Sequence, residues 1–125
     1  MADIKNRKDL ETLITLFYHR ALLDGKIGFI FTDVAKINLE KHIPIICDFW
    51  EAILFQKNTY KKNAIKIHQD LNDQVKLTAE HFESWLSLFN TCVDECFVGN
   101  NAETIKIRAR SIATVMQVKL AANRK

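Results

Sequence analysis

Glycine and proline are scarce in this chain of 125 residues, which holds three glycines and one proline. Because these residues form most tight turns, their scarcity argues against a many-stranded protein and favours long helices. Long uncharged runs are also missing. The longest covers residues 84–93, far short of the roughly 18 apolar residues that cross a bilayer. The sequence therefore predicts an all-α protein without a membrane span.

Strong charge of one sign is lacking as well. The chain has 18 Lys or Arg against 15 Asp or Glu, a net charge of +3 spread along its length without an arginine-rich run. Nucleic acid is therefore not an expected partner. Charges that start at Asp3 leave no room for an apolar signal segment, so the expected location is the cytoplasm.

Cysteine is too rare for a disulfide framework, since Cys47, Cys92 and Cys96 make an odd count. Cys92 and Cys96 would share one face of a helix, but zinc needs two further ligands of the right kind. We expect these thiols to pack as small apolar side chains. A Cys and His hydrolase has no support, because nothing ties a cysteine to a base.

What the chain does have is apolar residues at three- and four-residue spacing, which predicts amphipathic helices. The expected helices cover residues 10–22, 42–54, a short and more polar piece around 64–71, 78–97 and 100–120. Thr78 is the predicted cap of the fourth helix, and Asn100 with Glu103 forms a predicted capping box for the last. Pro44 should lie in the first turn of its helix or at a kink. With no internal repeat and no linker, residues 1–125 are expected to form a single domain.

Two of the four histidines, His42 and His68, lie on apolar helix stripes, where a charged imidazole would be costly. A single histidine of this kind is usually a satisfied core residue. Two of them favour a functional site, and a neutral imidazole facing an apolar cavity suits an axial haem ligand. No pair has the spacing of a helical zinc site.

Taken in order, the aromatic and histidine anchors resemble the group III truncated haemoglobins over residues from about Leu10 to Met116. The residues that carry this resemblance are Phe17-Tyr18, Phe31, His42, Asp48-Phe49-Trp50, His68 and Phe82-x-x-Trp85-Leu86-x-x-Phe89. The resemblance implies a truncated globin-like two-over-two helical sandwich around haem b, an iron protoporphyrin.

It also implies roles for particular residues. His68 matches the proximal ligand of the haem iron, and Tyr18, His42 and Trp85 match the distal polar positions. Lys66 and His81 are weaker candidates for the haem propionates. The residues expected to pack on haem are Phe31, Ile46, Phe49, Trp50 and Phe82.

The function implied is binding of a diatomic gas (oxygen, nitric oxide or carbon monoxide) for retention, chemistry or detoxification rather than bulk oxygen transport. Nitric oxide dioxygenase or peroxidase-like activity would need an external reductase, because the chain has no flavin or nicotinamide motif. His42, close to Pro44, is expected to gate ligand access. Two alternatives remain at this point: a haem-free helical interaction module, and a ligand sensor coupled to a separate output domain.

Overall fold

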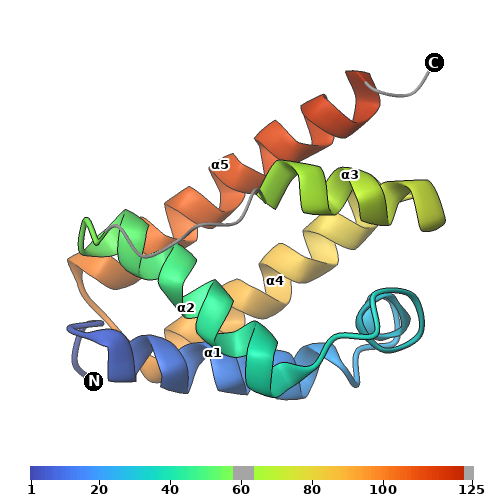
Figure 1. The fold of residues 1–125 in the computed structure, drawn as a ribbon. Coiled ribbons are helices and arrows are strands. Elements are labelled where there is room, and N and C mark those ends of the chain that lie inside the picture. The colour runs from blue at the N-terminus through green and yellow to red at the C-terminus, as the bar shows by residue number, and fades with distance from the viewer. Residues whose placement is uncertain (58–63, 123–125) are drawn as a thin grey trace.

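The computed structural model describes residues 1–57 and 64–122 of the chain, and within these ranges it contains helices and no strand. The prediction of an all-α protein is confirmed. In chain order the elements are α1 (Arg7–Ala21), a π-helical turn η1 (Ile30–Val34), α2 (Leu39–Leu54), α3 (Ala64–Gln74), α4 (Ala79–Cys96) and α5 (Asn100–Ala122) (Figure 1).

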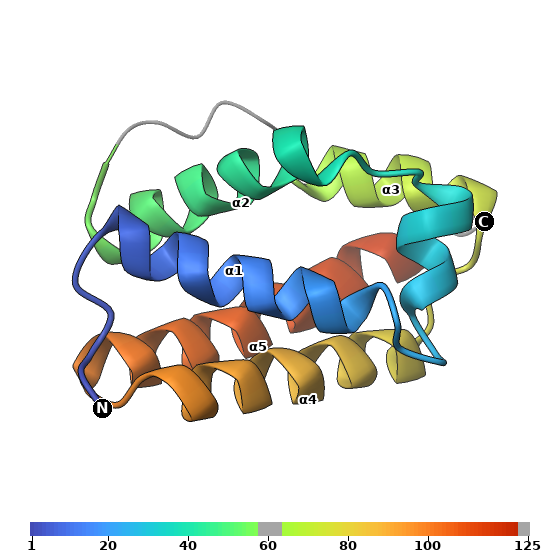
Figure 2. The ribbon, with the colours of Figure 1, turned by 90° about the horizontal axis from the view of Figure 1, so that it is seen from below.

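Four long helices form two pairs. Helix α1 packs against α2 and α4, and α4 packs against α5. Figure 2 shows α1 and α2 on one side of the molecule and α4 and α5 on the other. The short α3 contacts α5 instead of joining either pair. This is the arrangement of two helices over two that the family resemblance implied, and it places α3, which carries His68, beside the layers.

Side-chain caps fix where three of the helices begin. Asn6 accepts a hydrogen bond from the backbone N–H of Asp9 in α1, and Asn38 accepts one from Glu40 in α2. The predicted Thr78 cap of α4 is confirmed, since its hydroxyl accepts from the His81 N–H at 3.2 Å. Each cap satisfies an amide that has no partner inside its own helix.

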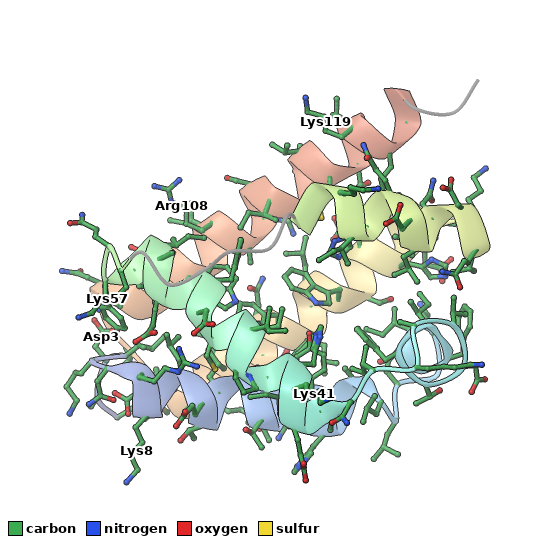
Figure 3. The ribbon with its side chains drawn as sticks, viewed as in Figure 1. Asp3, Lys8, Lys41, Lys57, Arg108 and Lys119 are labelled. Carbon is green, nitrogen blue, oxygen red and sulfur yellow. The ribbon has the colours of Figure 1, made fainter. Side chains whose placement is uncertain are left out.

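The predicted capping box of α5 is wrong. The carboxylate of Asp3 accepts the backbone N–H groups of Asn101 and Ala102, each at 2.9 Å, so the N-terminal segment caps the last helix. Gly99 makes this approach feasible. Its φ is +144°, and a Cβ there would lie 2.5 Å from Cγ of Asp3. Figure 3 shows Asp3 at the end of the molecule where α5 begins. The sequence located the start of α5 correctly at Asn100, but the group that caps this helix comes from the N-terminal segment.

Pro44 lies inside α2, beyond its first turn. Because proline has no backbone N–H, the carbonyl of Glu40 lacks the usual partner four residues ahead. Pro44 therefore does not lie in the first turn of its helix, which was one of the two places expected from the sequence. The turn that carries His42 comes just before the missing hydrogen bond.

The core lies between the two helix pairs and is formed by apolar side chains of every long helix. Its fully buried members include Leu10, Phe17, Leu86, Phe89 and Ile105. Cys47 and Cys92 are buried and Cys96 is partly buried, which agrees with the packing role expected for the thiols. In the part of the chain that the structure describes, no helix is both long and apolar enough to cross a membrane.

Candidate functional site

Tyr18 of α1 and His42 of α2 meet directly at the junction of their helices. The Tyr18 hydroxyl oxygen lies 2.8 Å from Nε2 of His42, and the two rings are perpendicular with centroids 5.0 Å apart. Phe31 of η1 packs edge-on against the same Tyr18 ring at 5.6 Å. Three of the residues singled out by sequence thus form one cluster built from three elements.

Both polar members of this cluster stay neutral near pH 7. Burial raises the pKa of Tyr18, and the nearby Cys47 raises it further, so the phenol keeps its hydrogen. Burial lowers the pKa of His42, and His68 lowers it further. A neutral imidazole has one N–H and one lone pair. Tyr18 can therefore donate to Nε2, or accept from it and aim its own hydrogen elsewhere.

His68 lies on α3 and is partly buried. The charge of His68 is the smaller of the two causes that lower the pKa of His42, which lies on a different helix. Isoleucine, phenylalanine and tryptophan side chains from α2, α4 and η1 are the partly or fully buried residues of this region.

Stacked aromatic rings form the wall behind the cluster. Trp85 and Phe89 of α4 are parallel, with centroids 5.2 Å apart, and Phe17 meets Trp85 edge-on at 5.9 Å. Trp50 of α2 also stacks on Phe89, with ring centroids 5.6 Å apart, and is only 2% exposed. Trp50 is therefore a core residue at the back of this wall.

The other expected haem-packing residues lie around the same region. Phe49 meets Trp50 edge-on at 5.2 Å and remains partly buried. Ile46, one turn after His42 on α2, is also partly buried, whereas Phe82 at the start of α4 is buried. These side chains supply an apolar lining without a formal charge.

The two candidates for the propionates already have partners. Lys66 pairs with Asp70 one turn later on α3, at 3.3 Å and in exposed surroundings. His81 accepts the Thr78 N–H through Nδ1 at 3.1 Å, and Phe29 packs edge-on against its ring. His81 therefore has a structural role at the start of α4. That role uses the Nδ1 atom of its imidazole and not Nε2.

These residues fit a haem by the chemistry of their donors. Iron porphyrin binding requires a neutral imidazole, an apolar lining and polar hydrogens near the open coordination position. His68 lies partly buried on α3, and burial favours the neutral form of His42 on α2. Tyr18, 5% exposed, keeps its hydroxyl hydrogen among aromatic rings.

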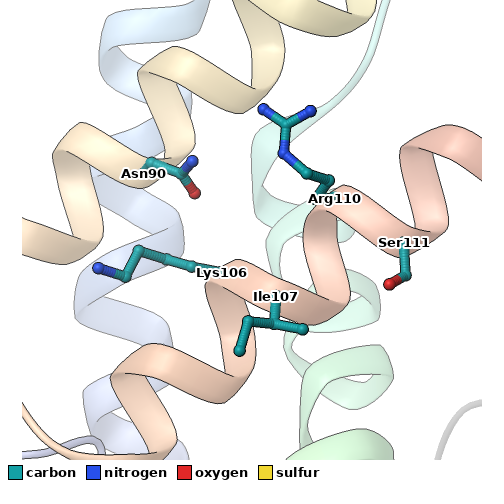
Figure 4. A pocket seen from close by; sticks show the side chains of 5 residues that line it. All are labelled: Asn90, Lys106, Ile107, Arg110 and Ser111. Carbon is teal, nitrogen blue, oxygen red and sulfur yellow. The ribbon is translucent and has the colours of Figure 1, made fainter.

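A second hollow, of about 380 Å³, lies away from this cluster between α4 and α5. Figure 4 shows its lining, which consists of Asn90, Lys106, Ile107, Arg110 and Ser111. Its cations are engaged by carboxylates, since Lys106 binds Asp94 at 2.6 Å and Arg110 binds Glu83 at 3.3 Å. The Oδ1 atom of Asn90 is buried without a hydrogen-bond partner.

Sequence reasoning missed the ion cluster at Arg7. Its guanidinium contacts Asp48 and Glu51 of α2, each at 2.6 Å. One signal was present, because a cation at the first residue of a helix opposes the helix dipole and so suggests a tertiary partner. Periodicity could not identify that partner.

Comparisons with known proteins agree with this architecture. The chain is 28% identical over 115 residues to the group 3 truncated haemoglobin ctb of Campylobacter jejuni, covering 90% of this chain and 88% of that protein. The crystal structure of group III truncated haemoglobin from Campylobacter jejuni superposes with a TM-score of 0.84 at 26% identity, covering 96% of this chain and 95% of that one. No family model matches the sequence. In sequence and in fold, the chain is therefore similar to group III truncated haemoglobin, which supports the resemblance seen in its aromatic and histidine residues.

Proposed function

We propose that this protein holds haem b through His68 and binds oxygen or nitric oxide in a pocket closed by Tyr18 and His42. The haem iron supplies the coordination position for the gas. The observation that carries the proposal is the contact between the Tyr18 hydroxyl and His42 Nε2 at 2.8 Å, beside a His42 whose pKa responds to His68. This contact supports the assignment of Tyr18 and His42 to the distal side.

Tyr18 is the main hydrogen-bond donor to the ligand. Its raised pKa keeps the phenol protonated, and burial excludes competing water. When His42 donates from Nε2 to the phenol oxygen, the Tyr18 hydrogen is free to point to the ligand. Donation in series polarises the hydroxyl and strengthens its outgoing hydrogen bond. Trp85, fixed against Phe89, is the second donor through its indole N–H.

His42 also controls access. In the closed position it lies against Tyr18, and its turn of α2 precedes Pro44. Movement of this turn opens the pocket and breaks the hydrogen bond at the same time. Replacement of His42 by alanine should therefore raise the ligand association rate, measured by flash photolysis of the carbon monoxide form. An unchanged rate would argue against gating.

Two donors, the buried Tyr18 and the partly buried Trp85, favour retention and chemistry over bulk oxygen transport, because each slows release of a polar ligand. Turnover of nitric oxide or peroxide at this pocket would consume electrons, and we assign their supply to an external reductase. One apolar core shared by α1, α2, α4 and α5 supports a single truncated globin domain over residues 1–125. We further propose a cytoplasmic location.

The test is the visible absorption spectrum of the purified protein, recorded with and without reductant and carbon monoxide. We expect a haem spectrum in the wild type and loss of the five-coordinate ferrous spectrum in the His68→Ala variant. A colourless protein that cannot be reconstituted with haem would favour a helical interaction module. Full colour and an unchanged ferrous spectrum in His68→Ala would reject His68 as the iron ligand.

Resonance Raman spectroscopy of the carbon monoxide form tests the distal residues separately. Loss of a donor alters the electrostatic field at the ligand, so the Fe–CO stretching frequency should shift in Tyr18→Phe and in Trp85→Phe. Thr12→Val is a matched control on α1, because its hydroxyl bonds only to the Lys8 carbonyl on the exposed face of α1. Unaltered stretching in both variants would contradict the distal assignment.

A further inference from the structure

Arg7 joins α1 to three acceptors on α2. One terminal nitrogen, Nη1, lies 2.6 Å from Asp48 Oδ1 and 2.6 Å from Glu51 Oε1. The other, Nη2, donates to the carbonyl oxygen of Pro44 at 3.1 Å. These residues follow Arg7 by 37 to 44 positions in the chain, so the cluster is a tertiary connection.

Within its own helix, Arg7 makes only a long ion pair, from its Nε to Oε2 of Glu11 at 3.6 Å. It is the first residue of α1, where the helix dipole favours an anion. Its connection to α2 compensates for this. Burial alone would lower the pKa of the guanidinium, but its bonds to Asp48 and Glu51 outweigh that effect and raise the pKa. Arg7 is therefore charged and firmly engaged.

Removing Arg7 would leave two carboxylates close together. Asp48 and Glu51 are three residues apart on one face of α2, and their side chains are only 32% and 14% exposed. Residues at this spacing are neighbours on a helix, and like charges there repel. Partial burial increases the repulsion, since water screens it less. The consequence is that α2 would lose its hold on α1 from Pro44 onward.

The turn that precedes Pro44 carries His42. Its ties to the chain before it are the hydrogen bonds from Lys41 and His42 to the Asn38 carbonyl, at 3.1 and 2.8 Å. Its tie to the rest of α2 is weakened, because Pro44 cannot donate to Glu40. Arg7 contacts α2 at Pro44 itself and at one and two turns beyond it. Arg7 thus anchors α2 to α1 directly after the turn that carries His42.

We propose that Arg7 is a positioning residue for His42, which anchors α2 at Pro44 and so keeps the His42 turn closed against Tyr18. This inference rests on the proposed function, because it assigns Arg7 to the control of ligand access. Arg7 does not touch the pocket. Its effect passes through the body of α2, and it should therefore disappear when His42 is absent.

The experiment measures carbon monoxide rebinding to the haem-loaded protein after flash photolysis, in a cycle of Arg7→Gln, His42→Ala and the double variant. We expect Arg7→Gln to raise the association rate by about threefold or more, which is a usual size for coupling between residues that are not in contact. In the His42→Ala background the same substitution should change the rate by less than about 1.5-fold. An equal effect in both backgrounds would show that Arg7 acts on the fold in general, and no effect in either would overturn the proposal.

Arg20→Gln is the matched control. Arg20 lies on the same helix and pairs with Glu95 of α4 rather than with α2. We expect it to leave the association rate unchanged. If Arg7→Gln does not fold, Arg7→Lys tests the same idea, because one ammonium group keeps the charge but cannot reach all three acceptors. A wild-type rate in Arg7→Lys together with a normal His42→Ala effect would reject the role of Arg7 while leaving the proposed function intact. Failure of the wild type to bind haem would reject both.

Discussion

The Tyr18 hydroxyl lies 2.8 Å from Nε2 of His42, so the two polar groups of an otherwise aromatic cluster satisfy one another. A ligand that enters must either break this hydrogen bond or accept a further one from the Tyr18 hydroxyl. Because both groups are neutral, the shared hydrogen can be redirected without separating charge. The pair can therefore hold the pocket closed and also offer a donor once it is occupied.

Tyr18→Phe tests the donor role kinetically. A hydrogen bond to a polar ligand is worth about 1–3 kcal/mol, which corresponds to a rise of about 5- to 150-fold in oxygen dissociation rate when it is lost. Stopped-flow displacement of oxygen measures this rate. Thr12→Val, which removes a hydroxyl from the exposed face of the same helix, should dissociate oxygen like the wild type.

His42 should make folding stability depend on pH. Its pKa in the folded protein is lowered from 6.5, so the unfolded chain binds the proton more readily. The stabilising contribution is fully present above about pH 6.5 and is lost as pH falls through the lowered folded value. We expect the free energy of unfolding to fall less between pH 7.5 and 5 in His42→Phe than in the wild type, as measured by urea unfolding. Equal slopes would show that His42 does not titrate in the folded protein as inferred.

Asp3→Ala should destabilise the protein through α5. Loss of a side-chain cap costs about 1 kcal/mol, and Asp3 accepts two amides of that helix. Burial opposes its ionisation, but the hydrogen bonds from Asn101, Ala102 and Ile4 outweigh it and lower the pKa below 3.8. The stabilisation is present above about pH 3.8 and disappears as pH falls through the lowered value. Thermal unfolding at pH 7 and pH 2.5 measures this.

Asp73→Ala is the control for that comparison, because Asp73 is an exposed carboxylate on α3. It should change the melting temperature little at either pH. A loss as large as that of Asp3→Ala would mean that total charge, not capping, is responsible.

Asn90→Leu should stabilise the protein. The Oδ1 atom of Asn90 is buried between α4 and α5 without a partner, and such an atom costs about 1–3 kcal/mol. Leucine has a similar volume and no acceptor. We expect a higher melting temperature by differential scanning calorimetry and an unchanged haem spectrum, since the hollow is separate from the pocket. A lower melting temperature would mean that the amide has a partner such as a bound water.

Local sequence patterns predicted the helices well because their causes lie within a few residues. The stripe before and after Phe17 made α1 recognisable, and Thr78 marked the start of α4. The candidate pocket residues followed from aromatic and histidine anchors in a familiar order. The same local reasoning failed at Asn100, where the actual cap, Asp3, is 98 positions from the amide of Asn101 that it binds.

Composition and periodicity were enough to specify an all-α chain and its helices, and the family resemblance supplied the candidate haem residues. The pairings between helices were not accessible in this way. Tyr18 meets His42 across 24 positions and Arg7 meets Asp48 across 41, and both contacts depend on how α1 and α2 are rotated and cross. That geometry results from packing of the whole core, because a helix stripe indicates which face is buried but not which residue of another helix it will contact.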